Sequence, residues 1–148
     1  MSTPEAPPRY HRSLPLSAAQ LEAVCSANAY RQATRYAKSA HMVDRFRVGA
    51  AISARFHGTR GIYSTRIDVT GRVLHFECTC PLAGARDACK HVVALGLTWL
   101  EEPDTFHDLD LTLARFAHMK KGELITAVRL AAQRLPEIIP LLERRPRP

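Results

Sequence analysis

The spacing of apolar residues predicts helical structure at the start of the chain. From Ser17, a suitable helix cap, apolar residues recur every three or four positions as far as Ala40. This period predicts one amphipathic helix of about six turns. Cys25 lies on its apolar side, where we expect a small buried side chain. Residues 1–16 contain four prolines and little periodicity, which predicts a flexible N-terminal segment.

Between residues 44 and 78 the apolar period changes to two, which is typical of strands. A first set of residues is expected to share one apolar face: Phe46, Val48, Ala50, Ile52, Ala54 and Phe56. A glycine-rich turn at 57–61 leads to a further strand at 62–69, and a tight turn at Thr70 and Gly71 leads to the last one at 73–78. The pattern predicts a small antiparallel meander of about three or four strands.

The helical period returns after the meander. It predicts a helix from about residue 88 to Leu100, ended by an acidic segment, and then helices at 109–117 and 123–135. Pro136 is placed to open a short last helix. The predicted fold class is therefore α+β, with an N-terminal helix, the meander, a helix and a C-terminal helical extension. We expect residues 17–102 to form one domain and residues 103–148 to form the extension.

The strongest chemical signal lies between the last strand and the next helix. Cys78 and Cys80 are separated by one residue, eight residues follow, and Cys89 and His91 are again separated by one. Three thiolates and an imidazole form a tetrahedral zinc shell with no place for water or substrate, which predicts one structural Zn²⁺ ion and no metal catalysis. The alternatives are ordinary thiols, a redox pair or an unrelated helix histidine. A redox pair more commonly has Cys-x-x-Cys spacing.

The residues between the predicted ligands are compatible with a zinc knuckle over residues 78–91. A Cys-x-Cys at a strand end directs both sulfurs to one side, and Pro81 and Gly84 allow the chain to turn back. Cys89 and His91 then open the next helix. Because two residues are a tight spacing for regular α-geometry, we expect an irregular first turn there.

The stretch CTCPLAGARDACKHVVAL resembles a SWIM zinc finger, whose pattern is Cys-x-Cys, a variable spacer and Cys-x-His. The proline after Cys80 and the basic residue Lys90 between the last two ligands also match that family, and the likeness extends over about residues 30–100. The resemblance implies a ββα-like zinc unit that binds DNA or proteins, found beside helicases, transposases and recombinase partners. None of those catalytic modules fits in 148 residues, and no Gly-rich phosphate loop or catalytic triad is apparent.

Charge points to a polyanionic partner. The net charge is +7, and residues 1–72 contain eleven Lys and Arg against four acidic residues, whereas residues 73–148 contain ten of each. Such a bias favours nucleic acid but also aids solubility. The family resemblance implies that this nucleic acid is DNA. The side chains expected to contact it lie on polar strand faces, in turns and in the knuckle: Arg45, Arg47, Arg55, Arg60, Arg66, Arg86 and Lys90. The alternative for the arginines is an ordinary solvated face. The alternative for Lys90 is that it offsets the −1 charge of three thiolates and one Zn²⁺ ion.

Two other functions are alternatives to nucleic-acid binding. The apolar stripe of the C-terminal extension suits an adaptor that docks on a protein such as a helicase or ATPase, although it also suits a core of its own. An enzymatic metal site would need the acidic residues at 101–110, which are more typical of a solvated loop. We expect no catalysis, no small-molecule substrate and no membrane association. Without an apolar leader or long apolar run, we expect a cytoplasmic protein.

Overall fold

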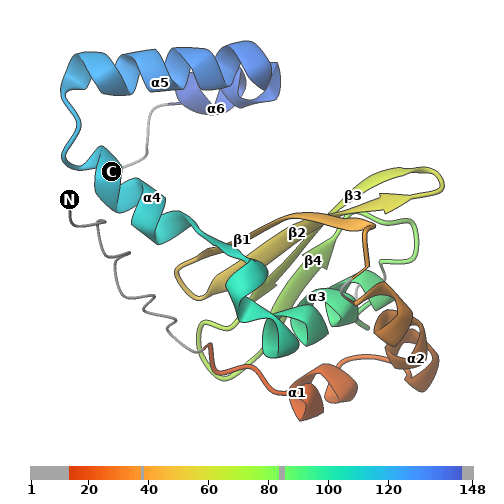
Figure 1. The fold of residues 1–148 in the computed structure, drawn as a ribbon. Coiled ribbons are helices and arrows are strands. Elements are labelled where there is room, and N and C mark those ends of the chain that lie inside the picture. The colour runs from red at the N-terminus through yellow and green to blue at the C-terminus, as the bar shows by residue number, and fades with distance from the viewer. Residues whose placement is uncertain (1–13, 38, 84–85, 145–148) are drawn as a thin grey trace, which may run out of the picture. The chain divides into compact units, whose positions relative to one another are not determined.

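The computed structural model describes residues 14–37, 39–83 and 86–144 (Figure 1). It divides into two compact units, residues 1–110 and residues 111–148. The predicted flexible segment 1–16 lies mostly outside the described residues. Its last residue, Leu16, belongs to the core of the first unit.

The first unit is built on a sheet in the order β4-β3-β2-β1-β5. Four strands form the predicted antiparallel meander: β1 (Met42–Val48), β2 (Ala51–Gly58), β3 (Gly61–Asp68) and β4 (His75–Cys78). The fifth strand, β5 (His107–Asp108), was not predicted and pairs in parallel with β1. The α+β class is confirmed.

The helices of this unit cover one face of the sheet. α3 (Lys90–Glu101) packs against β2, β3 and β4, and α1 (Ala18–Ala23) and α2 (Ala27–Tyr36) pack against α3 (Figure 1). Nine consecutive residues of α3, from His91 to Trp99, are buried. α3 is therefore the central element of the core, and its first turn is held firmly against the sheet.

The prediction of a single long N-terminal helix is wrong, because the helix is divided between α1 and α2. Ser26 has an extended backbone and its hydroxyl accepts a hydrogen bond from the Ala29 amide at 3.1 Å. This N-cap starts a second helix, since the cap satisfies an amide that has no partner within the helix. Cys25 lies at the break and is half-buried, packed against the core.

The predicted apolar face of the first two strands is correct for β2 and wrong for β1. Val48 and Ala51 pair across a two-residue turn at Gly49 and Ala50, with Gly49 at φ 55°. Paired residues lie on the same face of a sheet, so the parity of the inward positions changes across this turn. Ile52, Ala54 and Phe56 are buried as predicted, whereas Phe46 pairs with Ser53 on the opposite face.

The same change of parity places Arg47 inside the unit, which corrects its assignment to a polar strand face. Arg47 pairs with Ile52 and is only 6% exposed. Its guanidinium donates to an Asp108 carboxylate oxygen at 2.6 Å and to the Gly49 carbonyl at 2.9 Å, and lies 3.4 Å from Asp110. Arg47 therefore joins β1 to β5 and is not available to a nucleic acid.

Substitution of Arg47 tests this internal role. We expect Arg47→Met to lower the free energy of unfolding by about 2–3 kcal/mol, because Asp108 loses a charged hydrogen-bond donor in a largely buried place. Urea unfolding measures the difference. The matched variant Arg55→Met removes an exposed arginine 3.8 Å from Asp44, and we expect a change within about 0.5 kcal/mol. Equal stability of the two variants would contradict the internal role.

The second unit consists of helices, as predicted. α4 (Leu109–Phe116) leads into it, and α5 (Lys121–Arg134), a 3₁₀ turn at Pro136–Ile138 and α6 (Ile139–Glu143) follow. None of the described residues after Asp110 is buried. Among the described helices of the whole chain, none has the length and apolar character needed to cross a membrane.

Candidate metal centre

The first two predicted ligands lie at the end of β4 and directly after it. Cys78 is the last residue of β4 and pairs with Thr65 on β3. The ladder continues past it, because the Thr79 amide donates to the Ser64 carbonyl at 3.1 Å and the Ser64 amide donates to the Thr79 hydroxyl at 2.9 Å. Thr79 is thus fixed to β3, and Cys80 follows it into the buried interior.

The other two predicted ligands lie at the start of α3. Cys89 is the N-cap, with an extended backbone (φ −75°, ψ 168°), and its side chain makes no capping hydrogen bond. The preceding residue, Ala88, donates its amide hydrogen bond to the Val24 carbonyl at 2.7 Å, which anchors this approach to the end of α1. His91 is the second residue of the helix and is 4% exposed.

The expected irregularity in the first turn of this helix is wrong. α3 begins at Lys90, and the Val93 amide donates to the Cys89 carbonyl at 3.2 Å, as in an ordinary first turn. The Cys-x-His spacing is accommodated because Cys89 precedes the helix and has an extended backbone. No helical distortion is needed to bring the two side chains together.

The four predicted ligands meet in one place. The three sulfurs and a ring nitrogen of His91 all lie within 4.8 Å of one another; Cys78 is half-buried and the other three residues are buried. His91 presents Nδ1, which is 3.9 Å from the Sγ atoms of both Cys78 and Cys89. These four side chains can hold a metal ion.

The separations agree with the size of a zinc shell. Tetrahedral bonds of about 2.3 Å to sulfur and about 2.0 Å to nitrogen place the donors roughly 3.5–3.8 Å apart. The observed 3.9 Å between Nδ1 and two sulfurs is close to that range. A small inward movement of the side chains would complete the shell.

The pKa values of the three thiols indicate which sulfurs would lose a proton when a cation binds. The pKa of the Cys78 thiol is lowered to about 3, chiefly because the Cys89 side chain donates a hydrogen bond to it, with further donation from His91 and Thr65. The pKa of Cys89 is raised by that same hydrogen bond and by burial. Burial and the nearby Cys78 charge raise the pKa of Cys80. Two of the three sulfurs therefore favour the thiol form, and a bound cation would displace their protons.

Three aromatic rings hold His91 in position. Its ring centroid is 4.9 Å from Phe56 on β2, 5.4 Å from Tyr63 on β3 and 5.6 Å from Tyr36 on α2. The sequence analysis did not predict that these three aromatic residues belong to the site. Each one lies on a predicted element, but only the folded chain brings them around the same histidine.

Cys25 and the histidines other than His91 lie outside the cluster of four donors, as predicted. This statement covers the described residues, which do not include His11. Burial raises the pKa of the Cys25 thiol, and the charges of Glu22 and Asp87 add to the effect. Cys25 is thus the natural reference thiol for tests of the cluster.

The basic residues predicted to contact nucleic acid are distributed over different places. Arg45 has a side chain that is 15% exposed, donates to the Thr105 hydroxyl at 2.9 Å and lies 3.7 Å from Glu102. Arg55 and Arg66 lie on the sheet face opposite the helices, and Arg66 donates to Asp68 at 3.0 Å. Only Arg60, Arg86 and Lys90 lie beside the metal cluster.

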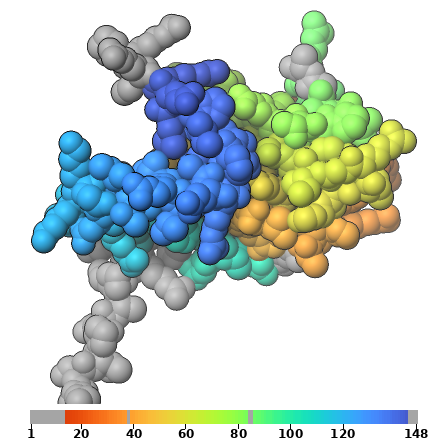
Figure 2. All heavy atoms as spheres, turned by 90° about the horizontal axis from the view of Figure 1, so that it is seen from above, coloured from red at the N-terminus to blue at the C-terminus, as the bar shows by residue number. Residues whose placement is uncertain are grey.

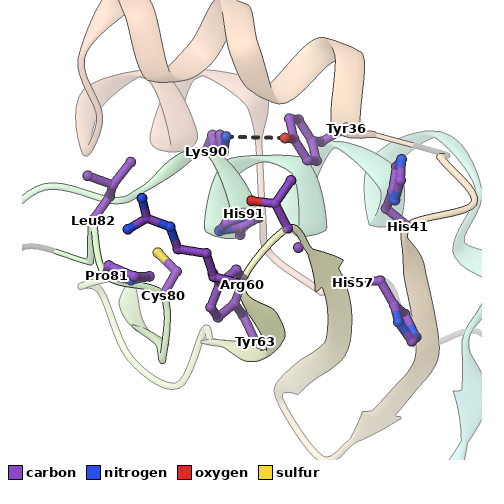
Figure 3. Close-up of a pocket in the computed structure, with 12 residues that line it drawn as sticks. Tyr36, His41, His57, Arg60, Tyr63, Cys80, Pro81, Leu82, Lys90 and His91 are labelled. Carbon is purple, nitrogen blue, oxygen red and sulfur yellow. Dashed lines mark hydrogen bonds between the residues drawn. The ribbon is translucent and has the colours of Figure 1, made fainter.

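A cleft of about 700 Å³ opens next to the cluster (Figure 3). The β2–β3 turn, the end of α2, the start of α3 and the segment after Cys80 form its walls. Figure 2 shows that the hairpin near residue 60 and the segment near residue 80 lie side by side at the surface. Arg60 and Lys90 line this cleft. Arg86 lines a second cleft, which shares Cys80, Leu82, Lys90 and His91 with the first.

Comparison with known proteins leaves the site as the basis for assigning a function. No family model matches the chain. Neither the curated proteins nor the solved structures yield a match. The geometry and chemistry of the chain's own residues therefore carry the functional conclusion.

Proposed function

We propose that the first unit is a non-catalytic, zinc-stabilised module of the SWIM type that binds nucleic acid. The observation that carries this proposal is the Cys₃His cluster with basic side chains in the two clefts beside it. Its ligands would be Cys78, Cys80, Cys89 and His91. The reduced thiols that such a site requires are typical of the cytoplasm, where we place the protein.

The donor set favours zinc in a structural role. Thiolates and an imidazole suit Zn²⁺ better than hard cations, which prefer oxygen ligands. Four protein donors fill a tetrahedron, so the ion would supply folding free energy and leave no coordination position for a substrate. The chain's own contribution is to hold the donors at a strand end and a helix start, which are fixed by the β3–β4 ladder and by the packing of α3.

The likeness to SWIM fingers is supported by where the two ligand pairs lie. The Cys-x-Cys pair ends an antiparallel strand and the Cys-x-His pair starts a buried helix, which is the ββα-like arrangement that the resemblance implies. Further support comes from the strands that precede β4 in the same sheet.

Nucleic-acid binding is supported by the cations around the cluster. In the described part of the chain, Arg60 and Arg86 form no hydrogen bond or ion pair, and Lys90 contacts only Tyr36 through its charged group. Cations without acidic partners attract phosphates, whereas Arg55 and Arg66 on the outer sheet face lie beside Asp44 and Asp68.

Salt dependence tests this proposal. We expect a fluorescent 12-nucleotide DNA to bind the purified protein, with affinity falling roughly 10- to 50-fold between 50 and 200 mM NaCl if about three phosphates are neutralised. Fluorescence anisotropy measures both affinities. Absence of binding at 50 mM NaCl would overturn the nucleic-acid part of the proposal and leave the zinc part standing.

A second candidate function, a protein adaptor, is favoured by the second unit. Large apolar side chains are exposed on its described helices: Leu111, Leu113, Phe116, Ile125, Val128, Leu130, Leu135, Ile139, Leu141 and Leu142. Such a surface suits a groove on a partner protein, for example a subunit of a helicase or ATPase complex. Binding of that kind depends far less on salt than binding to phosphates, so the same titration separates the two functions.

A further inference from the structure

We infer that the cleft beside the metal cluster receives one unstacked nucleotide of a single-stranded nucleic acid. The base would lie against Tyr36 and Tyr63, and the phosphate would lie at Arg60 and Lys90 (Figure 3). This inference rests on the proposed nucleic-acid function. It adds where the nucleic acid binds and that a single strand is preferred over a duplex.

The charge of the cleft suits a phosphate. Its lining contains two cations, Arg60 and Lys90, and no carboxylate. By contrast, the second cleft contains Asp87, and the arginines of the outer sheet face lie beside acids, with Arg55 3.8 Å from Asp44 and Arg66 3.0 Å from Asp68. Of these surfaces, the cleft next to the cluster offers cations without competing negative side chains.

Lys90 is directed by an aromatic side chain and not by the cluster's sulfurs. Its Nζ donates to the Tyr36 hydroxyl at 3.2 Å and lies 4.5 Å from the centre of that ring. No sulfur of the described chain is a hydrogen-bond partner of Lys90. Tyr36 and Lys90 therefore form one wall of the cleft, with a cation and a ring together (Figure 3).

His91 adds a hydrogen-bond donor at the base of the cleft. Its Nδ1 faces the sulfurs, so in the metal-bound form Nε2 carries the proton. Metal-binding histidines normally donate this second N–H to a carboxylate, a carbonyl or water. Within the described residues Nε2 has no protein partner, and Ser39 Oγ is the one fully buried side-chain oxygen or nitrogen without a partner. Nε2 is therefore not fully buried, and it is available to an acceptor in the cleft that His91 lines.

The size and the rings of the cleft suit a single base. About 700 Å³ lies within the range of small-ligand sites. Tyr63 is held in place against the backbone of Gly58, where a Cβ atom would overlap its ring. Basic grooves with aromatic side chains bind single strands, whose bases can leave the stack. A paired base in a duplex cannot enter, so a duplex would reach only the cations at the rim.

The test compares a single strand with a duplex. Fluorescein-labelled dT12 and a 12-base-pair duplex that contains it are titrated with the zinc-loaded full chain at 50 mM NaCl. We expect the single strand to bind at least about tenfold more tightly, since stacking of one base alone gives a factor of this order. Equal affinity for both, or tighter binding of the duplex, would overturn the inference while the proposed function stands. Failure of both to bind would overturn the proposed function as well.

Charge reversal locates the contact. Arg60→Glu and the matched control Arg66→Glu change the net charge equally, but only Arg60 lines the cleft. We expect Arg60→Glu to weaken binding of dT12 at least about tenfold more than Arg66→Glu. Equal losses in the two variants would overturn the placement in this cleft. Zinc content and thermal unfolding, measured on each variant, confirm that the fold is intact.

A ring substitution tests the base contact. Tyr36→Leu removes the ring, and Tyr36→Phe retains it without the hydroxyl. We expect Tyr36→Leu to reduce the preference for dT12 over the duplex about five- to tenfold, with Tyr36→Phe close to the unchanged protein. An unchanged preference in Tyr36→Leu would overturn the stacking role. If Tyr36→Leu loses zinc, the pair of charge reversals decides the inference.

Discussion

Replacing Cys80 with serine or His91 with alanine is expected to abolish stoichiometric zinc binding and to remove most of the stability of the first unit. A structural zinc ion in small domains contributes on the order of 10 kcal/mol, which is comparable with the whole free energy of unfolding of an ordinary domain. Either change leaves three donors around the ion. Because the donors come from both β4 and α3, their junction would come apart.

Elemental analysis and circular dichroism measure this outcome, and Cys25→Ala provides the control. Cys25 lies outside the cluster, so its removal is expected to leave the zinc content at one ion per chain. The assignment of the site would be contradicted if Cys80→Ser, His91→Ala and Cys25→Ala all contained equal zinc.

Replacing Phe56 with alanine is expected to lower the free energy of unfolding by about 3–5 kcal/mol without removing the metal ligands. Phe56 is 0% exposed. Its ring lies 4.9 Å from that of His91, and it pairs with Met42 and Tyr63 in the sheet. The substitution therefore leaves a cavity directly behind a ligand.

Urea unfolding and metal analysis of the same samples separate the two effects of this change. We expect zinc to remain near one ion per chain while the unfolding midpoint falls. Val73→Ala, at a position that is 65% exposed, is the control and should change stability by less than about 0.5 kcal/mol. A Phe56→Ala protein as stable as this control would contradict the role of Phe56 in the core.

The features predicted correctly from the sequence are those that depend on neighbouring residues. The Cys-x-Cys and Cys-x-His pairs each lie within three residues, so their spacing alone indicates that each pair can share an ion. The helices of the C-terminal extension have a regular apolar period. Both patterns are local, so they can be recognised in the sequence without knowledge of the tertiary structure.

The features that were missed depend on a single turn or on distant partners. One capping residue, Ser26, divides the predicted helix, and a two-residue turn at Gly49 reverses the inward parity of β1. Arg47 was predicted to be a surface cation because its partner, Asp108, is sixty-one positions away. The alternation of apolar and polar residues does not report such a partner. A buried, paired arginine and a solvent-exposed arginine both appear in it as a polar position.

The cleft could not be predicted for a related reason. Tyr36, Arg60, Tyr63 and Lys90 come from four different elements or turns, and nothing in their spacing links them. Arg60 and Lys90 were identified individually as cations. Their position on one concave surface follows from the β2–β3 hairpin and from the packing of α2 on α3.

The most direct test of the central claim is a combined count of metal ions and reactive thiols in the purified protein. We predict one zinc ion per chain by elemental analysis. A thiol reagent should react with one cysteine, Cys25, before chelation and with all four cysteines of the chain afterwards. Absence of bound metal, with four thiols equally reactive before and after chelation, would contradict the account.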